Sequence, residues 1–150
     1  MPTGDDFEAT VSAICAAHAD REGPMLPILH DVQAEYGYIP QEAMPVIAKR
    51  MNVSRAEVHG VVSFYHDFRE TPAGARVVKL CRAEACKSVG ADALADDVRA
   101  RLGVDWHGTK DGVTLEPVYC LGLCACGPSA MVDGRPIARA DVDAVCGVAS

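Results

Sequence analysis

The sequence has no excess of basic residues, and this shortage argues against one broad class of function. Its 150 residues include 14 Lys and Arg against 21 Asp and Glu, which gives a formal net charge of −7. A protein that binds nucleic acid normally presents a basic face to the phosphate backbone. The sequence therefore predicts no nucleic-acid partner.

Long apolar runs are missing as well. The longest apolar stretches fall well short of the roughly 20 residues that a membrane-spanning helix needs. The segment Met1–Glu8 is polar and acidic, and it lacks the basic start and apolar middle of a signal peptide. We therefore expect a cytoplasmic protein that does not insert into a membrane.

Motifs for nucleotide binding and for catalysis are also lacking. The chain has no G-x-G-x-x-G segment, no phosphate-binding loop, and no evident acid–base pair or activated nucleophile. We expect no catalytic residues and no complete active site on this chain alone.

Cysteine, in contrast, is abundant and unevenly distributed. The seven cysteines are Cys15, Cys81, Cys86, Cys120, Cys124, Cys126 and Cys146. Structural disulfides are not expected in a reducing compartment. Five of the seven lie in two tight groups, and clustered thiols of this kind more often bind metal or carry out redox chemistry.

The first half of the chain has the apolar period of helices. Gly37 and Asn52 suit helix ends, and Ser54 with Glu57 has the spacing of a capping box. These signals predict a helical bundle, the N-terminal domain over residues 1–72. The expected helices cover residues 7–18, 25–36, 40–51 and 54–65.

The pattern changes after Thr71–Gly74, which we expect to be a hinge. Ser88 is expected to cap one helix and Asp141 another, and two Asp-Gly pairs mark hairpin turns. The order of elements predicts an α/β sheet domain over residues 73–150. Its expected strands cover residues 77–80, 104–106, 113–119, 130–132 and 136–138.

The two cysteine groups each follow directly on an expected strand. They are a C-x4-C at Cys81 and Cys86 and a C-x3-C at Cys120 and Cys124. A structural zinc site favours C-x2-C pairs, and a redox-active dithiol requires one. A [2Fe–2S] cluster is larger than one ion and suits wider spacing. Spacing favours the cluster, but leaves open a zinc-stabilised interaction module and a set of unrelated thiols.

Four segments together resemble one family. They are LPILHDVQAEYGYIP, VHGVVSFYHDFRETPAG, CRAEAC and VYCLGLC. The sequence resembles the thioredoxin-like [2Fe–2S] ferredoxins from about Ala9 to Ala140. That family includes the small flavin-associated subunit of respiratory complex I and of NAD-reducing hydrogenases. The segments YHDFR, CRAEAC and CLGLCACGP are most similar to the gamma subunit of soluble NAD-dependent molybdenum formate dehydrogenases.

The resemblance implies a fold, a cofactor and partners. A helical N-terminal part would precede a thioredoxin-like sheet, and one [2Fe–2S] cluster would be held by Cys81, Cys86, Cys120 and Cys124. Single electrons would pass between this cluster and an FMN on an NAD-binding partner subunit. In a formate dehydrogenase, another subunit would carry the molybdenum cofactor. Equivalent subunits of NADH–quinone oxidoreductase or NAD-reducing hydrogenase are the alternatives.

Three cysteines fall outside this ligand set. Cys15 lies on the expected buried face of the first helix and Cys146 in the last expected helix, and both are expected to be inert core residues. Cys126 departs from the complex I pattern and is followed at once by Gly127-Pro128. We expect Cys126 not to be a ligand but to lie near the cluster, where its S–H could donate weakly to a cluster sulfur.

Overall fold

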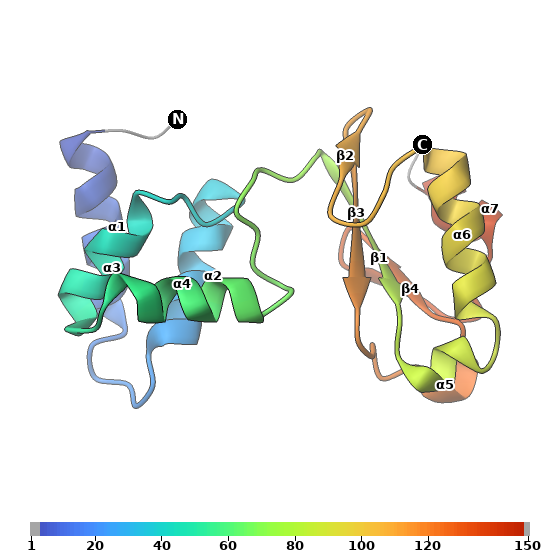
Figure 1. Cartoon of the computed structure of the whole chain (residues 1–150), viewed down its shortest axis with the longest axis horizontal. Helices are drawn as coiled ribbons and strands as arrows, with labels where there is room; N and C mark the ends of the chain where they lie inside the picture. The colour runs from blue at the N-terminus through green and yellow to red at the C-terminus, as the bar shows by residue number, and fades with distance from the viewer. Residues whose placement is uncertain (1–3, 149–150) are drawn as a thin grey trace. The chain divides into compact units, whose positions relative to one another are not determined.

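The structure is a computed structural model that describes residues 4–148. The chain divides into two compact units, Met1–Pro72 and Ala73–Ser150 (Figure 1). Residues 1–3 and 149–150, the ends of the two expected domains, lie outside the described residues. Each unit has a hydrophobic core of its own.

The first unit consists of the four helices that the sequence predicts. They are α1 (Asp5–Ala17), α2 (Met25–Tyr36), α3 (Ala43–Met51) and α4 (Arg55–Phe64). The second and third end at the left-handed residues Gly37 and Asn52. The third begins later than expected because the preceding residues form a turn, in which the N–H of Ala43 donates to the carbonyl of Pro40.

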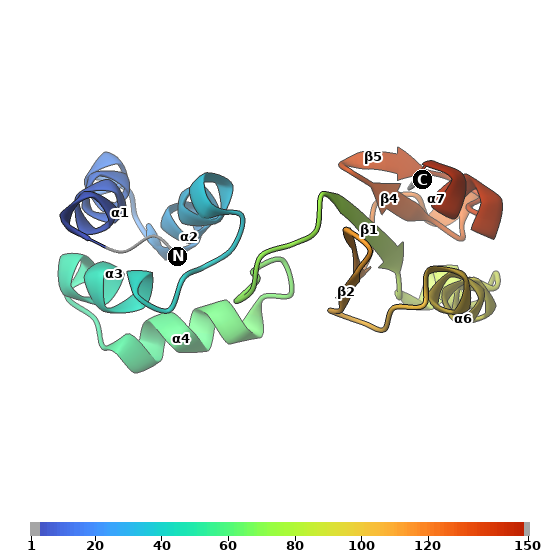
Figure 2. The same ribbon diagram turned by 90° about the horizontal axis from the view of Figure 1, so that it is seen from above.

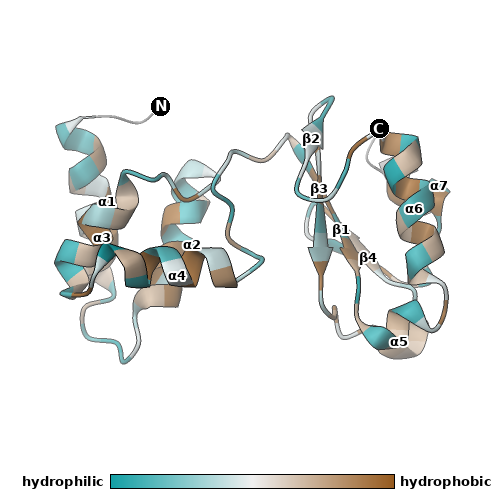
Figure 3. Ribbon diagram, in the orientation of Figure 1, coloured by the Kyte–Doolittle hydropathy of each residue, from teal (hydrophilic) through white to brown (hydrophobic). Residues whose placement is uncertain are grey.

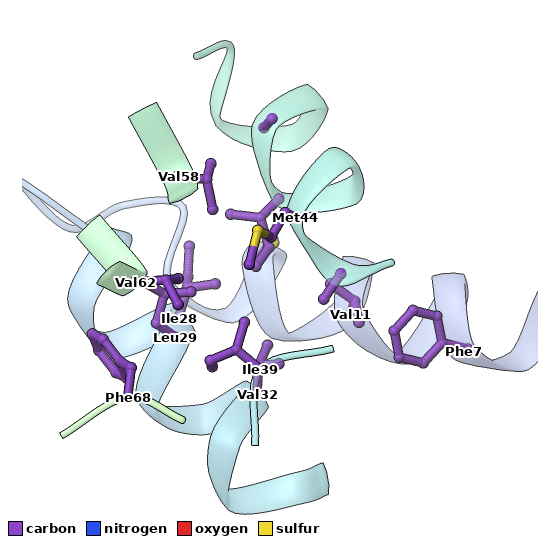
Figure 4. Packing of buried hydrophobic residues seen from close by; sticks show 14 residues of the cluster. Phe7, Val11, Ile28, Leu29, Val32, Ile39, Met44, Val58, Val62 and Phe68 are labelled. Carbon is purple, nitrogen blue, oxygen red and sulfur yellow. The ribbon is translucent and has the colours of Figure 1, made fainter. Parts of the chain in front are cut away.

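The core of this unit explains why the helices form. Figure 3 shows each helix as a mosaic of hydrophilic and hydrophobic residues, as amphipathic helices require. The apolar sides meet in one cluster, in which Val11, Leu29, Val32 and Val58 are fully buried (Figure 4). Burial of this area is the main source of stability, because isolated helices of this length are marginal in water.

A capping box starts α4 and gives a first testable prediction. The Ser54 hydroxyl accepts from the N–H of Glu57, and the Glu57 carboxylate accepts from the N–H of Ser54 at 2.8 Å. Ser54→Ala should lower the free energy of unfolding by about 1 kcal/mol. Denaturant titration followed by helical circular dichroism measures it. Ser63→Ala is the matched control, because that hydroxyl only donates back to the Gly60 carbonyl; equal losses in both variants would contradict the prediction.

The second unit is a five-stranded sheet in the order β2-β3-β1-β4-β5. The central strands β1 and β3 are parallel, and the other neighbours are antiparallel. The strands are β1 (Arg76–Cys81), β2 (Thr109–Lys110), β3 (Val113–Val118), β4 (Ala130–Val132) and β5 (Arg135–Ile137). The α/β class predicted from the sequence is confirmed.

Helices cover this sheet on one face. They are α6 (Ala91–Leu102) and α7 (Val142–Val148), whereas the short α5 (Glu84–Lys87) lies beyond the carboxyl end of β1. Helices α6 and α7 lie side by side against the sheet (Figures 1 and 2). Alternate strand residues such as Val78, Leu80 and Leu115 point into the core beneath them, where Val98 and Val145 also pack.

Both Asp-Gly pairs form the hairpin turns that the sequence predicts. The backbone φ angles are 50° and 79° at Asp111-Gly112, and 49° and 78° at Asp133-Gly134. Positive φ at both central residues defines the turn type that matches the twist of antiparallel strands. The second turn is also fixed from outside, because the Asp133 carboxylate accepts from the N–H of Val77 at 2.8 Å.

The prediction of a strand at Val104–Trp106 was wrong, because the structure has a turn there. The Asp105 carboxylate accepts from the N–H of Trp106 at 2.7 Å and from Arg99 at 2.6 Å, which holds the backbone in a turn. The Trp106 ring lies 5.2 Å from the guanidinium of Arg82. Tertiary contacts therefore override the β propensity of this segment, and the edge strand β2 begins at Thr109.

The role expected for Ser88 was also wrong. Its hydroxyl donates to the Ala85 carbonyl at 2.7 Å, so Ser88 ends α5 and does not begin the longer helix. Gly90, in the left-handed conformation with φ 98°, separates the two helices. None of the helices within residues 4–148 is both long and apolar enough to cross a lipid bilayer.

Candidate metal centre

Both cysteine groups leave the sheet at the same edge. Strands β1 and β3 are parallel neighbours, with Cys81 opposite Val118 at their carboxyl ends. Cys86 follows in α5, Cys120 lies shortly after β3, and Cys124 begins the short 3-10 helix η1 (Cys124–Cys126). Because the carboxyl ends of parallel strands share one edge, the fold brings the C-x4-C and C-x3-C segments together.

The second pair has the spacing of two ligands on one metal. The Sγ atoms of Cys120 and Cys124 lie 3.6 Å apart. Two thiolate sulfurs bound to one tetrahedral metal at about 2.3 Å lie about 3.8 Å from each other. The N–H of Gly122 donates to Cys120 Sγ at 3.3 Å, and a backbone donor of this kind stabilises negative charge on sulfur.

The Cys81 thiol joins the two groups. Its burial raises its pKa, but hydrogen bonds with the backbone of Ala83, the side chain of Cys86, the backbone of Cys120 and the side chain of Ser129 outweigh burial, so the pKa lies below its ordinary value. A lowered pKa favours the thiolate, which is the form that binds metal. Since one donor is on Cys120, the two cysteine segments are in contact.

Crowding of the sulfurs has the opposite effect on Cys124. Its hydrogen bond with Cys120 and the negative charge of that neighbour raise the pKa of Cys124, with smaller contributions from burial and from Cys86. Thiolates this close repel one another unless a cation lies between them. The donor set therefore fits a metal centre, because bound metal would offset the repulsion.

Backbone conformation is strained at the same place. Cys120 has φ 98°, a region that residues with a side chain rarely adopt. Gly122, with φ 75°, turns the chain between the two ligands at no such cost. Gly127 allows a close approach, since a Cβ there would lie 3.3 Å from Cys86 Sγ and 2.9 Å from Val89 Cγ2.

The four thiols differ in exposure. Cys81 and Cys86 are 2% and 1% exposed, whereas Cys120 and Cys124 lie at the surface. Two large hydrophobic side chains near them in sequence are also exposed, Val89 at 51% and Tyr119 at 58%. One side of the centre is thus enclosed, and the other opens onto a partly apolar surface.

Ser129 is a residue that the sequence did not single out. Its side chain is buried, and its Oγ lies 3.4 Å from Cys86 Sγ. Its carbonyl accepts from the N–H of Cys81 at 3.0 Å, which fixes its position beside β1. No motif marks this serine, because the contact joins residues that are far apart in the chain.

The remaining cysteines lie apart from these contacts. Cys15 and Cys146 are buried in the cores of the first and second unit, where burial raises the pKa of each thiol. Cys126 is half-buried in η1, and its carbonyl accepts from the N–H of Arg139 at 2.7 Å. Among the described residues its sulfur makes no hydrogen bond, and its weak S–H donation to a cluster sulfur stays a prediction.

Contacts among the four thiols are pairwise. Within residues 4–148, no three His, Cys, Asp or Glu side chains converge closely enough to hold a single metal ion. Cys81 contacts Cys86, and Cys120 contacts Cys124.

Comparison with protein families agrees with this geometry. The family model described as thioredoxin-like [2Fe-2S] ferredoxin matches residues 11–149. The chain belongs to this family. Membership in the thioredoxin-like [2Fe–2S] ferredoxins supports a [2Fe–2S] cluster as the cofactor of this chain.

Several relatives in the thioredoxin-like [2Fe–2S] ferredoxin family are subunits of larger enzymes by name. The chain is 36% identical over 114 residues to NADP-reducing hydrogenase subunit HndA of Solidesulfovibrio fructosivorans, covering 75% of this chain and 67% of that protein. It is 33% identical over 131 residues to NADH-quinone oxidoreductase subunit 2 of Thermus thermophilus, with coverage of 83% and 72%. Against an NADH-quinone oxidoreductase subunit of Mycobacterium bovis, identity is 34% over 129 residues, covering 85% of this chain and about half, 51%, of that protein.

The fold is also similar to part of one solved structure. One chain of the NAD+-reducing [NiFe]-hydrogenase in the H2-reduced state superposes with a TM-score of 0.66 at 22% identity. The match covers 83% of this chain and 21% of that one. At this identity the likeness concerns the fold alone.

Proposed function

We propose that the chain holds one [2Fe–2S] cluster on Cys81, Cys86, Cys120 and Cys124 and transfers single electrons. The observation that carries this proposal is that two thiol pairs lie at the carboxyl ends of neighbouring parallel strands, with the Sγ atoms of Cys120 and Cys124 3.6 Å apart. When bound, the cluster takes up and releases one electron at a time. The contacts within each pair favour Cys120 with Cys124 on one iron and Cys81 with Cys86 on the other.

Groups of this chain would stabilise negative charge on the ligand sulfurs and limit the access of water to the cluster. Backbone N–H groups of Ala83, Cys120 and Gly122 point at ligand sulfurs, and such donors help set a reduction potential. Burial of Cys81 and Cys86 encloses one side. Electrons would enter and leave at the exposed side, near Tyr119 and Val89.

The proposed partner is a flavin- and NAD-binding subunit. Its support is that HndA and the NADH-quinone oxidoreductase subunits are themselves named as parts of nucleotide-linked enzymes. We propose an NAD-dependent molybdenum formate dehydrogenase as the parent complex, because the segments YHDFR, CRAEAC and CLGLCACGP resemble its gamma subunit. Complex I and NAD-reducing hydrogenase are the alternatives. Native co-purification and identification of the partner subunits decides between them.

Metal analysis tests the central claim. We expect about two irons and two labile sulfides per chain, and no stoichiometric zinc, in anaerobically purified protein. A red-brown colour that bleaches with dithionite should accompany them, whereas zinc is colourless. One zinc and no iron would overturn the electron-transfer role in favour of a zinc-stabilised interaction module.

A further inference from the structure

A single buried hydroxyl is placed against the proposed ligand pair Cys81 and Cys86. Ser129 Oγ lies 3.4 Å from Cys86 Sγ, and the two residues are 2% and 1% exposed. We propose that Ser129 raises the reduction potential of the cluster by donating its O–H to the Cys86 thiolate. This inference rests on the proposed function and names Ser129 as a positioning residue that acts through Cys86.

The direction of the hydrogen bond follows from ligation. Either atom could donate if both carried a proton, but a metal-bound thiolate carries none. The hydroxyl then has to be the donor, and a donor to a charged acceptor makes the stronger kind of hydrogen bond. Because both side chains are buried, water does not compete for either atom.

Two backbone features hold the hydroxyl in place. The Ser129 carbonyl accepts from the N–H of Cys81 at 3.0 Å, which ties this residue to the end of β1. Gly127 has no Cβ, and a Cβ there would lie 3.3 Å from the same sulfur. The serine therefore occupies a fixed site beside Cys86, and its hydroxyl needs no rearrangement to donate.

The sign of the effect follows from charge. The reduced cluster has one more negative charge than the oxidised cluster, and part of it resides on the ligand sulfurs. A donor to Cys86 Sγ stabilises the reduced form more, so removing it should lower the midpoint potential. At a fixed solution potential, we expect removal of the hydroxyl to lower the ratio of reduced to oxidised protein about tenfold. For one electron this is a shift of about 59 mV.

The experiment is an optical redox titration of the full chain, with iron and sulfide assayed in the same samples. Ser129→Ala removes the hydroxyl and should lower the midpoint while keeping its iron. Ser88→Ala is the matched control, because it removes a hydroxyl two residues from Cys86 that bonds only to the Ala85 carbonyl. Ser129→Thr keeps a hydroxyl, so its midpoint potential should stay near that of the wild type. Ser129→Val has the shape of threonine without the hydroxyl, so its midpoint potential should fall as in Ser129→Ala.

The outcomes separate the two proposals. Wild-type protein without iron and sulfide would overturn the proposed function itself. An iron-loaded Ser129→Ala variant whose midpoint matches that of Ser88→Ala would overturn the role of Ser129 and leave the cluster assignment intact. If Ser129→Ala loses its iron, iron retained by Ser129→Thr and lost by Ser129→Val would support the role of the hydroxyl. Loss in Ser129→Thr as well would assign Ser129 to packing and overturn the inference.

Discussion

Replacing Cys124 with serine is expected to destroy the cluster or alter its spectrum markedly, whereas Cys126→Ser should leave iron content and the EPR line shape intact. The two thiols are only two residues apart, so either could reach iron on sequence grounds. The structure places Cys124 Sγ 3.6 Å from Cys120 Sγ. It gives the sulfur of Cys126 no contact of this kind among the described residues. A hard hydroxyl is a poor replacement for a soft thiolate, so the ligand position should lose its metal.

Cys126→Ser is itself the matched control for Cys124→Ser, since both variants replace one sulfur within the same short helix η1. Iron and sulfide assays on anaerobically purified variants, with EPR spectra of the dithionite-reduced forms, measure the outcome. Destruction of the cluster by Cys126→Ser, with Cys124→Ser spared, would show that Cys126 is the ligand.

A chain that begins at Ala73 is expected to keep its cluster and lose its partner subunit. The second unit has its own sheet and core, and all four proposed ligands lie in it. The first unit contains none of them, yet it forms a complete four-helix core. We propose that residues 1–72 serve mainly in docking to the flavin-bearing subunit. Its exposed aromatic side chains at the end of α4, Phe64 at 74% and Tyr65 at 43%, are candidate contacts.

Co-purification of tagged full-length and truncated chains with the partner measures this prediction. Iron content and the circular dichroism of the truncated chain show whether its sheet remains folded. Phe64→Gln in the full chain is a milder companion variant, because it alters only an exposed side chain. Recovery of the partner at full yield by a folded, iron-loaded truncated chain would contradict the docking role.

Much of the fold could be predicted because local signals agreed with the final structure. The four helices of the first unit follow the apolar period, and Ser54, Gly37 and Asn52 fix ends as expected. The hairpins at Asp111 and Asp133 follow from Asp-Gly pairs, since few other residues accept positive φ twice in succession. Cysteine spacing favoured a [2Fe–2S] cluster but left zinc open, whereas the longer motifs predicted the family that the comparison shows.

The errors arise where contacts of particular side chains outweigh the backbone propensity of a segment, or join residues far apart in the chain. Trp106 was assigned to a strand, but Asp105 and Arg99 hold its backbone in a turn. The role of Ser88 depends on where α5 ends, which its own sequence does not show. Ser129 escaped notice because its importance arises from Cys86, a residue of another element that only the folded sheet brings near.

The parallel pairing of β1 with β3 determines the order in which such a centre can be assembled. Helix α6 and strands β2 and β3 separate the two thiol pairs along the chain, so the pairs meet only after β1 and β3 have paired. Bound metal would then act as a cross-link that closes this long loop and reduces the conformational entropy of the unfolded chain. Release of the metal and opening of the sheet would become a single cooperative event, and bleaching of the visible absorption on heating would report the unfolding of the second unit.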